Sequence, residues 1–155
     1  MRIIFIILLG SVLCASPPLF VGGVGLFDAG ASNQGTLLLE YRGGHPTYHI
    51  HTQIGTYLTT NESFYGYFGL GYDASIGDKY KITPSFAVGY YARGNGRDMG
   101  YPILFRPGIE LTRVYSNNIR LGLQYTFLSN FGIDTPDPGV HNVILLFAIP
   151  LNFIL

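Results

Sequence analysis

The feature that most constrains this chain is a repeated alternation of apolar residues with polar or small ones. In residues 80–90 the even positions are apolar and the odd positions are polar or small. The same alternation recurs over 103–112 and 119–127, and again over 37–42, 48–58 and 64–73. Successive side chains of a β-strand point to opposite faces, so each segment has one apolar face and one polar face. The pattern predicts an all-β fold and argues against a helical bundle.

Two further segments, about 19–28 and 142–154, bring the expected number of strands to eight, the smallest common barrel number. The residues from 17 to 155 then divide into about 17 per strand and connector, which suits transmembrane strands of about 9 to 11 residues. The tight connectors 43–46, 76–78 and 116–118 alternate with mostly longer ones at 29–35, 59–63, 94–101 and 130–141. In a membrane barrel the short turns are expected on the periplasmic side and the longer loops outside.

The charged residues decide which face of each strand points inward. In each alternating segment the charged residues lie on one face, and the opposite face carries Leu, Ile, Val, Phe and Tyr. Charged residues make up only 12% of the chain, about half the usual share for a soluble protein. We therefore predict an eight-stranded antiparallel up-and-down transmembrane β-barrel with paired charges inside, and a soluble ligand-binding barrel is the alternative. Pro84 and Pro107 fall within two strands, where each removes a ladder hydrogen bond unless it lies at a bulge or a strand end. The expected interior charges are Glu40, Arg42, Lys81, Arg106, Glu110 and Arg120.

Residues 1–16 read as a Sec-type signal peptide, with Arg2, an apolar run over 3–9 and small residues at Ala15 and Ser16. The expected mature domain is therefore 17–155, placed in the bacterial outer membrane. Cys14 allows a lipoprotein alternative, although the residues before it lack the expected small side chain. No later segment has about 18 consecutive apolar residues, so no transmembrane helix is expected.

Several classes of ligand are disfavoured by the composition. Nine basic and nine acidic residues give a net charge of zero, so no basic surface is available for a nucleic acid. His45, His49 and His51 suggest a metal site, but no nearby Cys or carboxylate completes a ligand set, and polar filling of the interior is favoured. Residues 94–97 follow a strand but precede no helix, which excludes a phosphate-binding loop. We expect no metal and no cofactor.

Several short blocks from Tyr65 onward occur in an order typical of one known family. They are Gly69–Asp73, Thr83–Tyr90, Asp98–Gly100, Phe105–Leu111, Leu128–Ile133, Asp137–Gly139 and Ala148–Leu151. In these blocks the chain resembles the outer-membrane lipid A 3-O-deacylase (PagL-like) family. The resemblance implies hydrolysis of the 3-linked acyl ester of lipid A in the outer leaflet, so lipid A or lipopolysaccharide would be the partner.

The catalytic motif of that family is only partly present. The family reads His-x-Ser-Asn, with a Glu twelve residues after the Ser, and Ser129 and Asn130 match it. Phe127 stands at the His position and His141 at the Glu position, and the family's Asn-Pro-Gly begins with Asp137 here. Phe127 cannot take a proton from the serine, which needs an adjacent base to act as a nucleophile.

Two hypotheses follow for the residues around this motif. Strand parity places Ser129 and His141 on the lipid-facing sides of neighbouring strands near the same rim. The first hypothesis is a rearranged esterase, with Ser129 as nucleophile, His141 as substitute base, Asn130 helping to hold the oxyanion, and a carboxylate from Asp134 or Asp137. The second is a non-catalytic outer-membrane barrel, in which Ser129 and Asn130 end a strand and His141 is a rim residue at the headgroup level.

Overall fold

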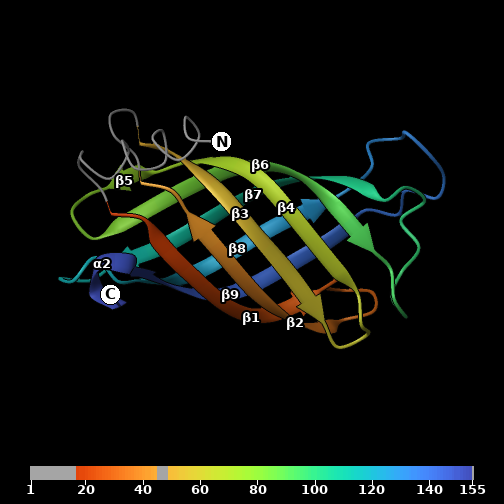
Figure 1. Cartoon of the computed structure of the whole chain (residues 1–155), viewed down its shortest axis with the longest axis horizontal. Helices are drawn as coiled ribbons and strands as arrows, with labels where there is room; N and C mark the ends of the chain where they lie inside the picture. Colours follow the sequence, from red (N-terminus) through yellow and green to blue (C-terminus); the bar gives the residue numbers. More distant parts are fainter. Residues whose placement is uncertain (1–16, 45–48, 155) are drawn as a thin grey trace, which may run out of the picture.

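The computed structural model describes residues 17–44 and 49–154 and shows a barrel (Figure 1). The predicted signal peptide at 1–16, with Cys14, and His45 lie outside the described residues. The elements are β1 (Leu19–Phe27), β2 (Gln34–Arg42), β3 (Ile50–Thr59), β4 (Phe64–Tyr72), β5 (Ala74–Ile76), β6 (Tyr80–Ala92), β7 (Ile103–Val114), β8 (Arg120–Leu128), β9 (Val140–Pro150) and the short helix α2 (Leu151–Ile154). Among these described residues no helix is long and apolar enough to span a membrane.

Each long strand pairs antiparallel with its neighbours, and the pairing of β4 with β6 closes the sheet on itself. The wall therefore has eight long strands, as the alternation predicts. The short strand β5 continues the register of β4, because Gly71 pairs with Ser85 and Ala74 then pairs with Ile82. β4 and β5 are thus two pieces of one wall segment.

The two prolines that fall within strands account for two gaps in the hydrogen-bond ladder. Pro84 lies in the gap of β6 between the partners of β4 and those of β5. Pro107 lies between the start of the β7–β8 pairing at Gly108 and an isolated bridge that joins Phe105 to Ser129. Proline has no N–H to donate, so the ladder is interrupted at these points while the β6–β7 register runs on unbroken.

The longer connections gather at one end of the barrel, which we call the outer end. They are the segments 28–33, 60–63, 93–102 and 129–139 (right-hand side of Figure 1). The short connections 77–79 and 115–119 lie at the opposite, inner end. The tight turns expected at 76–78 and 116–118 are confirmed, whereas most of the tight connector expected at 43–46 lies outside the described residues.

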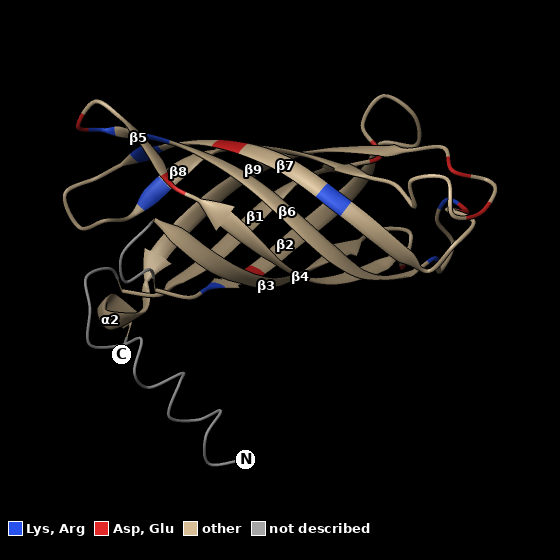
Figure 2. Cartoon of the chain, turned by 90° about the horizontal axis from the view of Figure 1, so that it is seen from above, with Lys and Arg blue, Asp and Glu red and all other residues tan. Residues whose placement is uncertain are grey.

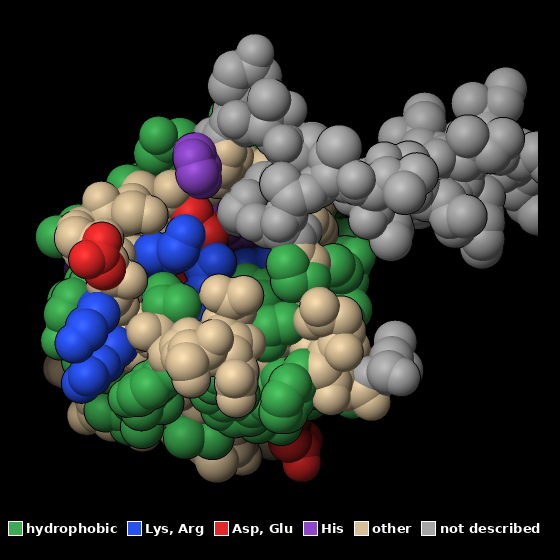
Figure 3. All heavy atoms as spheres, turned by 90° about the vertical axis from the view of Figure 1, so that its left-hand side faces the viewer, with side chains coloured by type: hydrophobic (Ala, Val, Ile, Leu, Met, Phe, Trp, Pro, Cys, Tyr) green, Lys and Arg blue, Asp and Glu red, His purple; other side chains and the backbone are tan. Residues whose placement is uncertain are grey.

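The outside of the wall is apolar on every long strand. Val24 is 59% exposed and Leu123 56% exposed, and comparable residues lie on the other strands. Figure 3, a view onto the inner end, shows apolar side chains around the outside and charged side chains at the mouth. A continuous apolar belt of this size marks a surface that contacts lipid rather than water. The predicted assignment of faces is confirmed.

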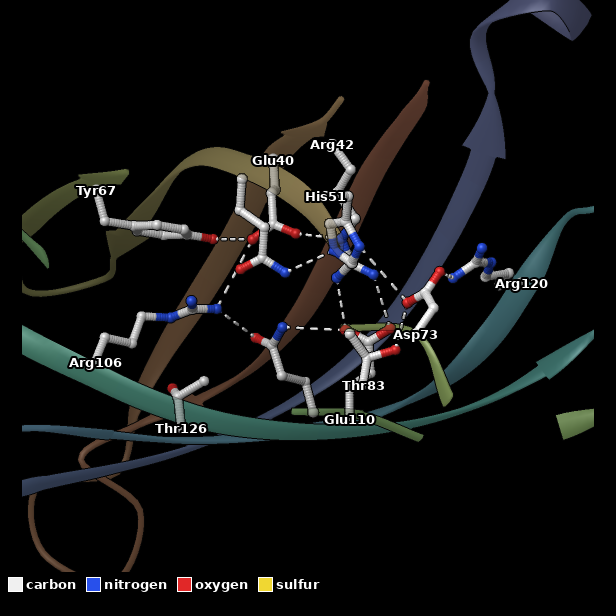
Figure 4. Close-up of polar contacts among 12 residues, drawn as sticks. Glu40, Arg42, His51, Tyr67, Asp73, Thr83, Arg106, Glu110, Arg120 and Thr126 are labelled. Carbon is white, nitrogen blue, oxygen red and sulfur yellow. Dashed lines mark hydrogen bonds and ion pairs between the residues drawn. The ribbon is translucent and has the colours of Figure 1, made fainter. Parts of the chain in front are cut away.

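The inside is filled by a network of charged and polar side chains (Figure 4). Arg42 donates to Glu40 at 2.6 Å and to both carboxylate oxygens of Glu110 at 3.0 and 2.6 Å. The guanidinium of Arg106 lies 4.1 Å from the ring centroid of Tyr67, whose hydroxyl donates to Glu40. The expected network of interior charges is therefore present, and its ion pairs join Arg42 to Glu40 and Glu110, and Arg106 to Glu40.

Nearer the inner end, Arg120 donates to Asp73 at 2.8 Å, and the hydroxyl of Thr83 donates to the same carboxylate. His51 points inward as expected and lies 3.8 Å from Asp73, whereas His49 precedes β3 and is exposed. Within the described ranges no group of three or more potential metal ligands was found. The remaining charges lie mostly at the two ends of the barrel (Figure 2).

Candidate active site

The motif residues lie where β8 and β9 reach the outer end. Phe127 of β8 is directly opposite His141 of β9 in the strand register. Ser129 comes just after β8, and its backbone exchanges two hydrogen bonds with Phe105 of β7. Phe105, Phe127 and Ser129 therefore share the outward parity that the sequence predicts for this part of the wall.

Although its parity is outward, Ser129 is covered by the loop that follows it, and only 4% of its surface is exposed. Its hydroxyl donates to one carboxylate oxygen of Asp137 at 2.8 Å and accepts from the N–H of Phe131 at 2.9 Å. The same oxygen of Asp137 accepts from the N–H of Gly132, and the other accepts from the N–H of Asn130, both at 3.1 Å. Asp137 thus ties both ends of the loop together.

Asn130 is fully buried, and its side chain hydrogen-bonds to its own loop and to the loop 93–102. Its amide nitrogen donates to the carbonyl oxygens of Met99 at 2.8 Å and Asp134 at 3.0 Å. Its side-chain oxygen accepts from the N–H of Gly132 at 2.9 Å. In this arrangement the donors expected to hold an oxyanion are already used by backbone carbonyls.

His141 is exposed on the outer surface of β9. Its Nδ1 lies 2.5 Å from the hydroxyl of Tyr125, and its ring is stacked on the ring of Tyr125 and tilted against that of Phe127, with centroids 5.9 and 5.1 Å away. Tyr125 precedes Phe127 by two residues on the same face of β8. The imidazole is therefore turned toward the membrane-facing aromatic residues.

Phe127 stands at the position of the family's histidine, and the end of the loop 129–139 packs against it. Gly139 has a φ of +67°, and a Cβ built on it would lie 2.7 Å from the ring of Phe127. The aromatic surface continues around the barrel, since Phe131 stacks on Phe105 with centroids 5.2 Å apart, and Phe105 stacks on Phe86. Apolar rings thus surround the position of Ser129.

The structure brings Ser129, Asn130 and Asp137 into one cluster and holds His141 in another. Within residues 17–44 and 49–154, Ser129 and His141 share no hydrogen bond. Of the two carboxylates considered from the sequence, Asp137 contacts Ser129, whereas Asp134 accepts from the N–H of Thr135. Sequence reasoning missed Tyr125 as the partner of His141, although its shared parity with Phe127 was a usable signal.

Comparison with known proteins supplies independent information on the fold. A family model described as lipid A 3-O-deacylase (PagL) matches residues 26–150. The crystal structure of the outer membrane enzyme PagL superimposes with a TM-score of 0.68 at 17% identity, over 85% of this chain and 99% of that chain. A structure from a study of de novo design of transmembrane β-barrels gives a TM-score of 0.62 at 12% identity, over 86% of this chain and 94% of that one. No curated protein sequence matches the chain.

At these identities the two solved structures show a shared fold and nothing finer. The family model, in contrast, runs from the end of β1 to the end of β9 and includes every motif residue named above. It confirms the resemblance expected from the sequence, together with the outer-membrane barrel fold. The chain therefore belongs to the lipid A 3-O-deacylase (PagL) family.

Proposed function

We propose that this chain is a non-hydrolytic member of its family, an outer-membrane barrel that contacts lipid A or lipopolysaccharide without cleaving it. The observation that carries the proposal is the 2.8 Å hydrogen bond from the hydroxyl of Ser129 to Asp137. A serine becomes a nucleophile when a neighbouring base takes its proton, and in the family that base is a histidine. Here Phe127 stands at that position, and the serine hydroxyl closes a loop.

Lipid contact is supported by the outer surface around the motif. Phe131, Phe105 and Phe86 form a stacked row of aromatic rings that runs from the loop 129–139 to the middle of β6. Aromatic residues are enriched where membrane barrels meet the interface between lipid and water. We propose that the outer leaflet in contact with this row contains lipid A, and that residues 1–16 direct the chain into the secretory pathway.

Ester hydrolysis is the second candidate, and one observation favours it. His141 is exposed and lies opposite Phe127, which makes it a diagonal neighbour of Ser129 across the β8–β9 pair. Diagonal neighbours in a sheet are about 7 to 8 Å apart, within reach of long side chains. In this candidate Ser129 attacks the acyl ester, His141 takes its proton, and Asn130 and Asp137 support the loop.

The test is mass spectrometry of lipid A from outer membranes with and without the expressed protein. We expect the natural protein to release no acyl chain. A variant with Phe127→His, His141→Glu and Asp137→Asn rebuilds the family motif and frees the serine from its carboxylate partner, so release of the 3-linked chain is expected from it.

The matched control adds Ser129→Ala to the same three changes, which should abolish release. Acyl release by the natural protein that is lost in both Ser129→Ala and His141→Ala would contradict the proposal. It would establish the rearranged esterase, because a nucleophile and its base act as one unit.

A further inference from the structure

One charged side chain of the barrel wall faces lipid and not the interior. The alternation that the sequence shows over 103–112 continues to the end of β7 at Val114, and the next outward position is Arg113, which is exposed. Every other Asp, Glu, Lys and Arg of the described strands has inward parity, so Arg113 is unique among them in facing outward. The inward residues are Glu40, Arg42, Lys81, Arg106, Glu110 and Arg120.

Arg113 lies near the inner end of the wall, among exposed aromatic and apolar side chains. Its register partners are Tyr80 of β6 and Leu121 of β8, and both are exposed. The guanidinium carbon of Arg113 lies 5.3 Å from the ring centroid of Tyr115, an exposed residue of the turn that follows β7. A cation over an aromatic face is attracted to it, so the ring holds the guanidinium at the level where aromatic residues border the lipid.

The backbone around Arg113 is fixed by hydrogen bonds to the two neighbouring turns. The N–H of Val114 donates to the carbonyl oxygen of Lys79 at 2.7 Å, and the N–H of Tyr115 donates to that of Ile119 at 2.8 Å. The short turns 77–79 and 115–119 therefore flank Arg113 on either side, and its position on the wall is set by regular structure.

No carboxylate of residues 17–44 and 49–154 forms an ion pair with Arg113. Asp78 and Lys79 are adjacent and both exposed in the turn 77–79, so their charges offset each other and the charge of Arg113 remains. A basic side chain on the lipid side of a barrel is costly at the bilayer midplane and tolerated near the interface. There a lipid headgroup can supply the anion that the protein does not.

The chemistry of Arg113 and its neighbours suits a phospholipid. A guanidinium donates two parallel N–H bonds to a phosphate. Leu111 lies two residues before Arg113, about 7 Å along the strand, and is exposed together with its register partner Leu123. A phosphodiester on Arg113 would thus place the acyl chains of the same lipid along these two leucines. The inner end lies in the leaflet opposite the one expected to hold lipid A, where the lipids are phospholipids.

The opposite side of the wall has the same geometry without the charge. The closed strand order places β2 four positions from β7 in either direction around the wall. The next-to-last residue of β2 is Tyr41, just as Arg113 is the next-to-last residue of β7, and both are exposed. The two strands end at the same end of the barrel, so the surface around Tyr41 is a control that the fold itself provides.

We propose that Arg113, flanked by Tyr80 and Tyr115, binds the headgroup phosphate of an anionic phospholipid at the inner end of the barrel. The anionic class follows from the uncompensated charge of Arg113. A zwitterionic phospholipid brings its own cation to its phosphate, whereas the phosphodiester of phosphatidylglycerol has none and pairs fully with the guanidinium. The site lies at the end of the barrel opposite Ser129, and the proposal stands whether or not that serine is hydrolytic.

The chain contains no tryptophan, so a single introduced one reports on the lipid around it. Leu111→Trp places the reporter beside Arg113, and Leu39→Trp places it at the matching position of β2. Each full-length variant is reconstituted in phosphatidylcholine vesicles with increasing fractions of phosphatidylglycerol brominated on its acyl chains, which quenches nearby tryptophan, and brominated phosphatidylcholine is the reference. We expect a preference for phosphatidylglycerol of about fivefold in Leu111→Trp, the effect of one basic residue at an anionic membrane surface, and no preference in Leu39→Trp.

Two further changes are made in the Leu111→Trp protein. Arg113→Gln removes the charge but keeps a polar side chain, and it should abolish the preference. Arg93→Gln is the matched control, since Arg93 is an exposed arginine at the outer end, 3.5 Å from Asp98, and it should keep the preference. Millimolar inorganic phosphate should leave the quenching unchanged, because the acyl chains contribute to binding. Heat-modifiable migration in gels verifies that each variant is folded.

A preference for phosphatidylglycerol that survives Arg113→Gln would overturn the proposal, since another group would then attract the lipid. Equal preferences at the two reporters would overturn it as well, because the whole apolar belt would then select anionic lipids without a site at Arg113. Loss of quenching on addition of inorganic phosphate would show that the arginine holds a free anion and not a lipid. None of these readouts involves ester release, so their outcome is separate from the test at Ser129.

Discussion

Two polar clusters in this barrel are built around carboxylates, but their surroundings differ. In the interior, Glu40 and Glu110 share the guanidinium of Arg42, and all three side chains are almost completely buried. At the outer rim, Asp137 accepts only uncharged donors, the hydroxyl of Ser129 and the N–H groups of Asn130 and Gly132. The stability of the interior cluster therefore depends on which charged side chains are present. At the rim, two of the three donors are backbone N–H groups, which almost any residue would supply.

The comparison predicts its largest effect at Arg42. Arg42→Met leaves two buried carboxylates without their shared cation, and removing one partner of a buried ion pair typically costs about 3 to 5 kcal/mol. Urea unfolding of the refolded protein in detergent micelles measures the loss. Lys79→Met, in the exposed turn at the inner end, is the control and should change stability little. An equal, small effect of both changes would remove the distinction between interior and surface charges.

A charge placed where no partner exists should have the next largest effect. Leu123 is exposed on the lipid-facing side of β8, and Leu123→Arg should cost about 2 to 4 kcal/mol if that site lies near the bilayer midplane. Asn117→Arg, in a turn at the inner end, is the matched control. The measurement is unfolding in lipid vesicles, and tolerance of Leu123→Arg there would contradict the assignment of this face to lipid.

The interior residues and the lipid-facing residues could be predicted from the sequence, because side chains alternate between the two faces along each strand. Arg42, Arg106 and Glu110 fall at positions whose inward direction is fixed by the parity of their strands. The choice of partner could not be anticipated, since which inward groups meet depends on the stagger between strands that are far apart in the sequence. Arg42 and Glu110 are such a pair, from β2 and β7.

For the motif at the rim, the alternation along the strand predicted the direction of a side chain but not its burial. Parity correctly placed Ser129 on the outward side, yet the residue is buried, because the loop 129–139 folds back over it. No periodic signal runs through that loop. The hydrogen bonds of Asp137 and Asn130 set the path of the loop. Sequence reasoning could assign these two residues to a motif, but it could not predict which backbone groups they contact.

Removing the rim carboxylate should have a moderate and local effect. Asp137→Ala deletes three hydrogen bonds to one ionised group, each of the kind worth about 1.5 to 3 kcal/mol, but the loop is near water, which replaces part of the loss. We expect faster amide hydrogen exchange at Asn130 and Gly132, with little change in the unfolding of the whole barrel. Asp134→Ala is the control, and the same protection of these amides in both variants would show that Asp137 does not close the loop.

The smallest effect is expected at the other rim pair, Tyr125 and His141. Tyr125→Phe removes the hydroxyl that lies 2.5 Å from Nδ1 of His141 but keeps the ring on which the imidazole stacks. Because both residues are exposed, the change should cost no more than about 0.5 to 1.5 kcal/mol, the net worth of a typical hydrogen bond. The informative readout is the nitrogen NMR spectrum of His141, whose Nδ1 signal should shift while the interior His51 stays unchanged. Tyr115→Phe, at the inner end, should leave both histidines unaltered. If Tyr125→Phe leaves the His141 signals unmoved, the imidazole is not held by Tyr125, and the separation of His141 from Ser129 would lose its physical cause.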